Sequence, residues 1–399
     1  MKKLILIITI AVSSFSQAQT WTNYTSDDGL IEGFIYDMIQ DTDGTIWFCD
    51  WSNDTEPGIG NFDGTTWMQF GMGDGPSVNT YRAIIQDGNG VYWFGSFFAD
   101  AGLDRYDGTT WQNFDTSDGL PFDGNVRDLI EAEDGTLWLT AGGLTNFDGT
   151  TFTNFDLSDG LPGLNTSKLF EDSQGNIWIG TIGAGVAMYD GTSFTNYSMS
   201  DGLIANDIFG IFEDQDNNMW FTAHSSGASK FDGVNWTSFT EADGLAANET
   251  WALGMDNDGL VYVGTNAGIS RYDGTSFETI DVTDGLVENH IRSILKDSDG
   301  LMWFGTWGGV SRFNPILDVF DTLKEKITIF PNPASSVLNI TSDAQIKSVT
   351  IYSITGAEVL TISENNITQI NIASLQQGVY WVKVIDDLDR TGFEKVMIN

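Results

Sequence analysis

One short pattern, an aromatic residue followed by Asp-Gly, recurs along most of this 399-residue chain. Successive copies lie 41 to 44 residues apart, and Phe313-Asn314 is a degenerate seventh copy. The six full copies begin at Phe62, Tyr106, Phe147, Tyr189, Phe231 and Tyr272. A period in the forties with an aromatic signature is typical of β-propellers, in which each repeat forms one blade. The repeat therefore constrains the fold more strongly than any other feature of the sequence.

Each repeat contains four runs of strand length, which we call runs A to D. In the second repeat they are residues 79–86, 91–95, 102–106 and 110–114. An Asp-Gly pair joins runs C and D and predicts a tight hairpin in which both turn residues have positive φ. A loop with Asp-Gly-Leu, such as the one that starts at Asp118, then leads into run A of the next repeat.

The number of runs predicts how the ring closes. Runs A, B and C occur seven times, whereas run D has six internal copies and one more at residues 20–24. We expect this N-terminal run to complete the last blade, because that closes the ring without a free sheet edge. The prediction is an all-β chain with a seven-bladed β-propeller over residues 19–315. Its aromatic content of 13% and hydrophobic content of 41% rule out general disorder.

The last repeat carries a specific motif. Asp284-Gly285-Leu286 is followed by Ile291, Ile294, Asp299-Gly300, Trp303-Phe304-Gly305-Thr306 and Gly309. This segment resembles the two-component-regulator propeller repeat, and the resemblance covers all seven units. Such repeats build the extracellular sensor half of many bacterial hybrid histidine kinases. We find no transmembrane helix, kinase or response-regulator region in the sequence, so we do not expect signalling by phosphotransfer.

A separate β-rich segment, residues 327–399, follows a linker-like stretch at residues 316–326. Its seven short runs predict a small antiparallel β-sandwich. Its most specific residues are Phe330-Pro331-Asn332-Pro333-Ala334, Val337-Leu338-Asn339-Ile340, Ile351-Tyr352, Gly356, Leu375, Gly378-Val379-Tyr380 and Lys395. In this order they resemble the type A C-terminal sorting domain of the type IX secretion system. The resemblance implies that the type IX machinery exports the chain across the outer membrane of a Bacteroidetes-type cell. An ordinary adhesive sandwich is the alternative.

The N-terminus and the charge indicate where the protein works. Residues 1–18 combine Lys2 and Lys3 with a short apolar run and the small residues Ser16 and Ala18, which is the pattern of a cleaved signal peptide. We expect no membrane span in the mature protein, a secreted or surface location, and a monomer. The net charge of −39 argues against nucleic acid and anionic membranes as partners. Cys49 is the only cysteine, so no internal disulfide is expected.

Alternating strand direction sorts the loops of every blade onto two faces of the ring. The A–B and C–D hairpins share one face, and the more variable B–C and D–A loops share the other. On this second face, aromatic residues that suit stacking on sugar rings follow run B. The candidate ligand-binding residues there are Trp51, Phe97, Phe98, His224 and Trp307. The alternative is that these side chains pack against neighbouring loops.

Basic residues are scarce, and four of them fall on run A, the strand expected to line the central channel. Arg82, Arg127 and Arg292 occupy equivalent positions, and Lys168 lies one residue later. Cations gathered at one channel of a strongly acidic protein suit a carboxylate or sulfate ligand. Salt bridges between blades are the alternative.

Catalytic chemistry finds little support in the sequence. Neither a His-based triad nor a G-x-S-x-G elbow can be assigned, so we predict no catalytic residues and no cofactor. Asp-rich turns at residues 41–44, 256–259 and 297–300 leave calcium open, although none continues into an EF-hand loop. We expect a non-catalytic propeller that binds an extracellular polysaccharide or similar polymer. The alternatives are an adhesin-like protein that binds another surface protein, and a polysaccharide lyase or hydrolase.

Overall fold

The repeats form separate sheets, as their period predicts. The computed structural model describes residues 21–51, 56–96, 101–121, 125–315, 327–342, 345–353, 357–364, 366–387 and 391–399. The predicted signal peptide and linker lie outside these residues. Trp21–Phe313 forms one compact unit, close to the range 19–315 expected for the propeller, and a second unit holds the C-terminal residues.

Seven four-stranded antiparallel sheets make up the first unit. Three of them contain β2 (Phe34–Gln40), β3 (Ile46–Trp51), β4 (Ile59–Phe62) and β5 (Trp67–Phe70); β6 (Tyr81–Gln86), β7 (Tyr92–Ser96), β8 (Leu103–Tyr106) and β9 (Trp111–Phe114); and β10 (Leu129–Glu131), β11 (Leu137–Leu139), β12 (Leu144–Phe147) and β13 (Phe152–Phe155). The next three contain β14 (Thr166–Glu171), β15 (Ile177–Thr181), β16 (Val186–Tyr189) and β17 (Phe194–Tyr197); β18 (Ile208–Glu213), β19 (Met219–Ala223), β20 (Gly227–Phe231) and β21 (Trp236–Phe239); and β22 (Thr250–Met255), β23 (Val261–Thr265), β24 (Gly268–Tyr272) and β25 (Phe277–Ile280).

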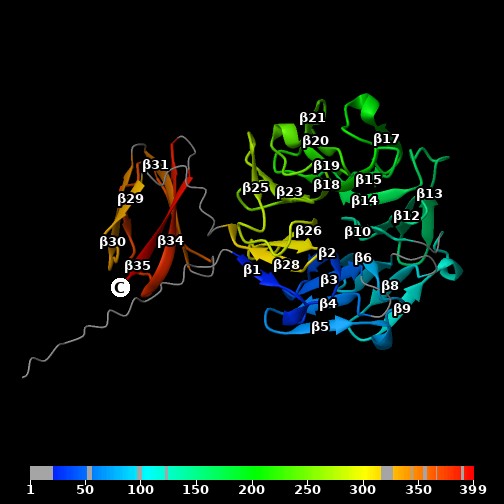
Figure 1. Cartoon of the computed structure of the whole chain (residues 1–399), viewed down its shortest axis with the longest axis horizontal. Helices are drawn as coiled ribbons and strands as arrows, with labels where there is room; N and C mark the ends of the chain where they lie inside the picture. Colours follow the sequence, from blue (N-terminus) through cyan, green and yellow to red (C-terminus); the bar gives the residue numbers. More distant parts are fainter. Residues whose placement is uncertain are drawn as a thin grey trace, which may run out of the picture. The chain divides into compact units, whose positions relative to one another are not determined.

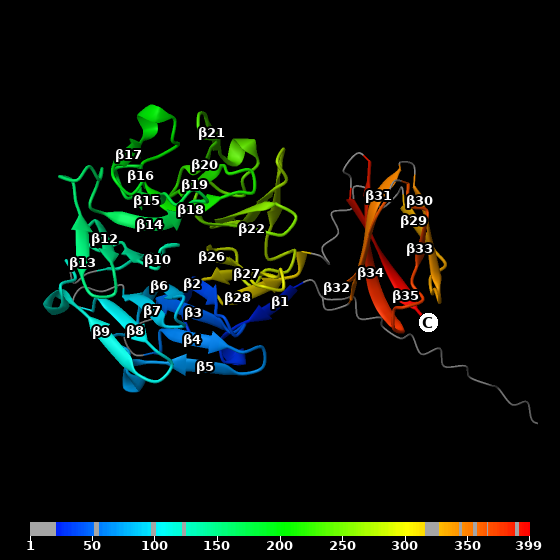
Figure 2. The ribbon, with the colours of Figure 1, turned by 180° about the vertical axis from the view of Figure 1, so that it is seen from behind.

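The last sheet joins the two ends of the unit. It consists of β26 (Ile291–Lys296), β27 (Met302–Thr306), β28 (Val310–Phe313) and the N-terminal strand β1 (Trp21–Tyr24). Strand β1 pairs with β28, with Trp21 opposite Phe313. The first strands of successive sheets are neighbours, and β26 also lies beside β2, so the sheets form a closed ring (Figures 1 and 2). The fold is therefore the all-β propeller that the repeat predicts.

In the Asp-x-x-Gly turn between the first two strands of a sheet, the aspartate side chain connects the turn to a buried indole. One oxygen of Asp172 accepts hydrogen bonds from the backbone N–H groups of Gln174 (3.0 Å) and Asn176 (2.9 Å). Its other oxygen accepts the indole N–H of Trp178 at 2.8 Å. The same indole bond joins Asp41 to Trp47, Asp87 to Trp93, Asp214 to Trp220 and Asp297 to Trp303. These aspartates thus have a structural role in the repeat.

The aromatic-Asp-Gly turns differ from the sequence prediction in the φ of their aspartate. Gly64 has a φ of 93°, but Asp63 does not share the positive φ that we expected of both turn residues. Instead, Asp63 Oδ1 accepts hydrogen bonds from the backbone N–H groups of Thr65 (2.8 Å) and Thr66 (2.7 Å). An aspartate that bonds the amides ahead of it stabilises a turn from an ordinary φ. Only the glycine therefore needs the left-handed region.

Four Asp-Gly-Leu loops contain the short 3-10 helices η1 (Ser26–Asp28), η3 (Thr116–Asp118), η4 (Met199–Asp201) and η5 (Glu241–Asp243), and the corresponding loop with Asp74-Gly75-Pro76 contains η2 (Met72–Asp74). At the end of η4, Gly202 has a φ of 116°. A Cβ at this position, as in any other residue, would lie 2.9 Å from Cβ of Trp236. The next residue, Leu203, is buried with Trp178 and Phe221 of two adjacent sheets. The loop therefore requires glycine and anchors its leucine between blades.

Two antiparallel sheets form the C-terminal unit. The first contains β29 (Ile327–Phe330), β30 (Val337–Ser342) and β33 (Gln369–Asn371), and the second contains β32 (Glu358–Ser363), β31 (Ile346–Ser353), β34 (Gly378–Asp386) and β35 (Thr391–Ile398). Both sheets contribute to one buried cluster, which includes Ile340, Ile351 and Val384. Within the described ranges, no helix is long and apolar enough to cross a membrane.

Candidate functional site

The innermost strand of six sheets carries a β-bulge at the same place. In β6, for example, the pairing with β7 shifts register between Tyr81 and Ala83, so that Arg82 is the extra residue of the bulge. A bulge re-aims a side chain and is frequent next to functional sites. The residues at this position are Tyr36, Arg82, Ser167, Phe209, Trp251 and Arg292. Together with Arg127, which precedes β10, they all line the central cavity.

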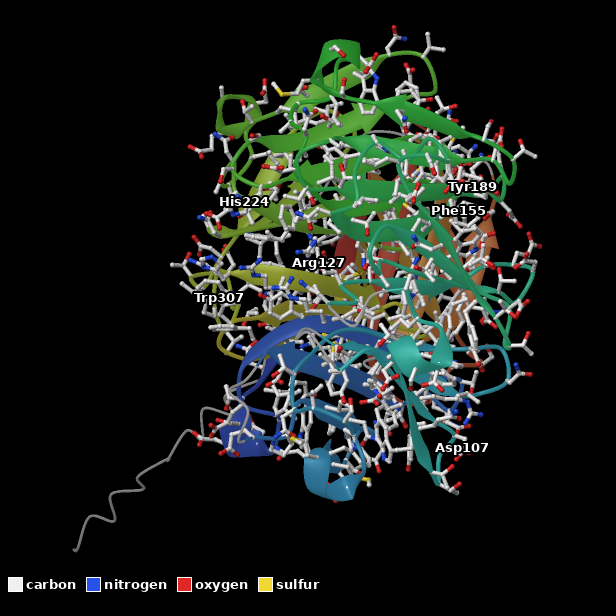
Figure 3. The ribbon with its side chains drawn as sticks, turned by 90° about the vertical axis from the view of Figure 1, so that its right-hand side faces the viewer. Asp107, Arg127, Phe155, Tyr189, His224 and Trp307 are labelled. Atoms are coloured by element: carbon white, nitrogen blue, oxygen red, sulfur yellow. The ribbon has the colours of Figure 1, made fainter. Side chains whose placement is uncertain are left out.

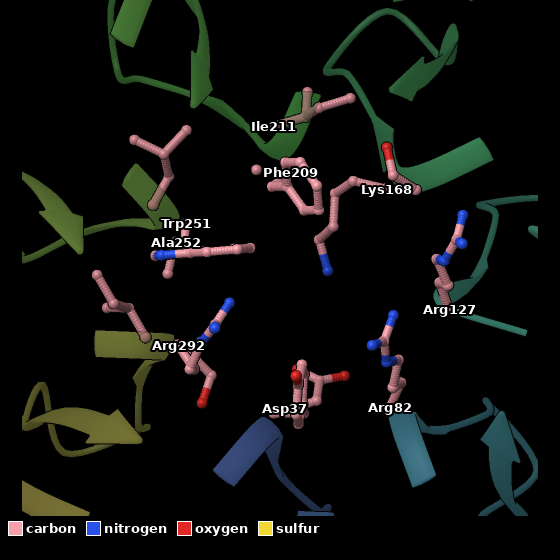
Figure 4. Close-up of a pocket in the computed structure, with 15 residues that line it drawn as sticks. Asp37, Arg82, Arg127, Lys168, Phe209, Ile211, Trp251, Ala252 and Arg292 are labelled. Carbon is pink, nitrogen blue, oxygen red and sulfur yellow. The ribbon is translucent and has the colours of Figure 1, made fainter. Parts of the chain in front are cut away.

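The cavity has a volume of about 270 Å³ and two chemically different sides. One side carries four cations, Arg82, Arg127, Lys168 and Arg292, which we call the cationic arc, and Asp37 lies between Arg82 and Arg292 (Figure 4). The other side consists of Phe209 and Trp251, whose rings meet edge to face at 4.9 Å and which we call the aromatic wall. The sequence-predicted cations of run A are therefore brought together at one site.

Two arginines of the arc, Arg127 and Arg292, have buried donors without a partner among the described residues. Arg127 donates from Nη1 to the carbonyl oxygen of Thr166 at 3.0 Å and to Asn165 Oδ1. The buried Nε atoms of Arg127 and Arg292 have no hydrogen-bond partner among the described residues. Burial lowers the pKa of both side chains, and burial together with the charges of Arg127 and Arg292 lowers the pKa of Arg82 to about 10. Mutual repulsion and incomplete hydrogen bonding both favour an anion here.

Lys168 differs from the three arginines because it has an ion-pair partner. Its Nζ lies 2.9 Å from Asp128 Oδ1, while Asp128 Oδ2 accepts the backbone N–H of Leu169 at 2.7 Å. Burial opposes the charged form, but the carboxylates of Asp128 and Asp37 raise the pKa of Lys168. Lys168 therefore forms a salt bridge between blades, which is the alternative to ligand binding given in the sequence analysis. Its ammonium group extends toward the middle of the channel (Figure 4).

A second cluster lies at the channel mouth, on the face of the B–C and D–A loops. The Nε2 atoms of His224 and His290 lie 3.8 and 3.9 Å from the same oxygen of Glu249. The ring of His290 stacks on Trp307 at 3.9 Å, and Trp307 remains 38% exposed. Figure 3 shows His224 and Trp307 on one side of the ring and Asp107, a hairpin-turn residue, on the other. The mouth thus adds an exposed aromatic surface to the cavity.

The structure places only part of the predicted aromatic set. Trp51 ends β3, but its side chain is outside the described part of the chain, as are Phe97 and Phe98. Sequence reasoning omitted Trp251 from the site, although the equivalent position in other repeats pointed to it. It also missed Glu249 and His290, because D–A loop residues carry no repeat signal for a shared site.

Comparison with sequence families agrees with both motifs found in the chain. The profile of the two component regulator propeller matches residues 29–52, 160–183, 202–225 and 285–308, and that of the secretion system C-terminal sorting domain matches residues 328–399. The chain carries two-component regulator propeller repeats and a type IX sorting domain. The sorting domain is handled by the type IX secretion machinery, which directs the protein to the cell surface or the extracellular space.

Solved structures with the same fold come from proteins of several kinds. An extracellular domain of B. thetaiotaomicron, assigned to a hybrid two component system, has a TM-score of 0.66 and 20% identity over 95% of this chain and 57% of that one. PorZ, a surface component of the type-IX secretion system of Porphyromonas gingivalis, has a TM-score of 0.59 and 16% identity over 92% and 59%. The virginiamycin B lyase of Staphylococcus aureus has a TM-score of 0.59 and 13% identity over 73% and 98%.

These identities establish the fold alone. The chain spans less than two thirds of the length of the first two structures. No curated protein sequence matches this chain significantly. The function of this propeller therefore has to be inferred from its own residues.

Proposed function

We propose that this protein is a non-catalytic binding protein that recognises an acidic extracellular polysaccharide at the channel mouth of its propeller. The observation that carries the proposal is the gathering of three arginines at one cavity. Two of them, Arg127 and Arg292, keep a buried Nε–H group without a partner among the described residues. Guanidinium groups bind carboxylates and sulfates through paired hydrogen bonds, and such charge-assisted bonds are stronger than neutral ones.

The surroundings of the arginines suit a sugar polymer. Phe209 of the aromatic wall and the exposed ring of Trp307 offer apolar surfaces for the C–H faces of sugar rings. The net charge of −39 repels polyanions at long range, but at physiological ionic strength this repulsion is screened over about 8 Å. A short-range cationic site within an acidic protein therefore selects ligands that can enter the channel.

The carboxylates nearest to the cavity are engaged in structure, which favours binding over catalysis. Asp37 Oδ2 accepts the backbone N–H of Ile84 in the next sheet at 3.1 Å. In the same way, Asp128 Oδ2 accepts the backbone N–H of Leu169, which belongs to the sheet next to that of Asp128. Both acids therefore hold adjacent inner strands together rather than facing a substrate with a free oxygen pair.

The test is a binding panel with the full chain. Hyaluronan, alginate, polygalacturonate and chondroitin sulfate are compared with neutral dextran by isothermal titration calorimetry. At least one acidic polymer is expected to bind, and dextran is not. Arg82→Ala with Arg127→Ala is expected to weaken binding by at least about tenfold, because two charge-assisted contacts are lost.

A matched control separates the site from the net charge. Arg105 of β8 lies beside Asp107 at 3.6 Å and does not line the cavity, so Arg105→Ala is expected to leave affinity unchanged. Circular dichroism confirms that each variant is folded. Binding that survives the double substitution, or equal binding of dextran, contradicts the proposal. Capture of a surface protein without any acidic polymer would favour the adhesin-like alternative.

A further inference from the structure

The lining of the channel changes below the cavity, which limits how a polymer can enter. Lys168 and Asp37 line both the upper cavity and a second, deeper cavity, so they lie at the boundary between the two. The deeper cavity is lined mainly by apolar side chains such as Ile84, Ile130, Phe212 and Leu295. A hydrated polysaccharide cannot pass a lysine held by an ion pair and then continue along an apolar wall. We therefore take the mouth as the route of entry.

The cavity above this boundary is small. Pockets that enclose drug-sized ligands have volumes of about 300 to 1,000 Å³. A cavity of about 270 Å³ therefore suits one sugar ring rather than several rings in line. An internal unit of a chain would have to enter with both of its neighbours through the same opening, whereas a terminal unit brings only one.

The two sides of the cavity define the chemistry of that unit. The cationic arc lies on β26, β6 and β14 and in the segment before β10. The aromatic wall lies on β18 and β22. The indole Nε1 of Trp251 is buried without a hydrogen-bond partner among the described residues, so the wall also offers a donor. A ring with one acidic edge and one C–H face matches this division, and the hydroxyls of a sugar match the remaining donor.

From this division we propose that the channel binds the terminal uronic acid unit of a polysaccharide end-on, with its carboxylate on the cationic arc and its ring on the aromatic wall. The inference rests on the proposed function and specifies its ligand. The rest of the polymer leaves through the mouth past Trp307 and His224. Recognition then depends on chain ends and not on the number of acidic units in the chain.

Stoichiometry tests this geometry. Short and long fractions of one uronate polysaccharide that binds in the panel are titrated against the full chain by calorimetry and by light scattering. End-on binding predicts one protein per polymer chain at every length. It also predicts that the methyl glycoside of the same uronic acid displaces the polymer, whereas methyl glucoside does not.

Variants probe the two sides of the cavity. Trp251→Leu keeps an apolar residue but removes the flat ring and its donor, and it is expected to weaken binding by about tenfold or more. Arg127→Lys keeps the charge but loses the planar fork, and it is expected to weaken binding of the methyl uronoside as well as the polymer. Trp236→Leu, in β21 outside the cavity, is the matched tryptophan control.

The outcomes separate this inference from the proposed function. If the number of bound proteins rises with polymer length while Arg82→Ala with Arg127→Ala still weakens binding, the end-on geometry is wrong and the acidic-polymer function stands. Displacement by a sulfated neutral sugar but not by any uronoside would also overturn the uronate assignment. If no acidic polymer binds at all, both proposals fall together.

Discussion

The guanidinium carbon of Arg292 lies 3.5 Å from the centroid of the Trp251 ring. This contact joins the cationic arc to the aromatic wall. A desolvated cation–π contact contributes about 2 kcal/mol, so the indole face of Trp251 helps to hold Arg292 in the channel. The buried Nε–H group of Arg292 has no hydrogen-bond partner among the described residues. The site is thus organised by aromatic contacts as much as by charge.

Asp172→Ala tests the structural role of the repeated turn. The change leaves the buried indole N–H of Trp178 without its acceptor at 2.8 Å. We expect the free energy of unfolding to fall by about 2 to 3 kcal/mol, measured by urea denaturation. Asp190→Ala, in an exposed turn of the same sheet, is the control and is expected to cost less, because water replaces its oxygen. Equal losses would contradict the role assigned to the indole bond.

Chelation tests whether calcium stabilises the ring. Asp256 already accepts backbone N–H bonds from Asp258 and Leu260 and the hydroxyl of Tyr262. Asp41 and Asp297 have corresponding backbone and indole donors. Addition of EDTA is therefore expected to leave the thermal unfolding midpoint unchanged. A lower midpoint that added calcium restores would show that these turns bind the metal.

Trp21→Ala tests the closure of the ring. The indole of Trp21 is 7% exposed and packs on Phe313 at 4.4 Å and on Phe304 at 5.9 Å. Its removal leaves a cavity between the two ends of the propeller, and we expect a loss of about 3 to 5 kcal/mol in the free energy of unfolding. Met68→Ala, at a 52% exposed site of the corresponding strand β5, is expected to change stability by about 0.5 kcal/mol or less. A small effect of Trp21→Ala would mean that the closing sheet contributes little.

Asp37→Asn tests the charge balance at the channel boundary. Burial, together with the charge of Asp128, raises the pKa of Asp37 to about 6 against the opposing charge of Lys168. The unfolded-state pKa is about 3.9, so the folded state binds this proton more tightly. The stability that Asp37 contributes is therefore greatest below pH 4 and is lost as the pH rises through 6.

Relative to the wild type, Asp37→Asn is expected to gain stability between pH 4 and pH 7, by at most about 3 kcal/mol. Urea denaturation at several pH values measures the difference. Asp190→Asn is the control of opposite sign, because hydrogen bonds from Thr192 lower the pKa of Asp190 to about 2. That variant is expected to lose stability relative to the wild type as the pH rises. A pH-independent difference for Asp37→Asn would contradict the raised pKa.

Much of the fold followed from local pattern. The regular spacing of the aromatic-Asp-Gly copies predicts one sheet per repeat, because each repeat must bury its apolar strands against the next. The surplus run Trp21–Tyr24 pointed to the pairing with Val310–Phe313 that closes the ring. Equivalent positions in the repeats also placed Arg82, Arg127 and Arg292 on the inner edge, since residues at the same register of a repeat share one environment. The prediction failed for Asp63, whose side-chain hydrogen bonds replace a positive φ.

The ring of sheets, the sorting domain and the inward position of the arginines could be predicted from the sequence, because they depend on the spacing of residues within and between repeats. Three contacts became visible only in the folded chain: Phe209 and Trp251 form a wall opposite the cations, Lys168 pairs with Asp128, and His224 and His290 share Glu249. The partners in these contacts come from different blades. Their distances depend on the curvature of the closed ring and on a bulge that turns one residue in each of six inner strands into the channel, and neither is encoded in a local pattern.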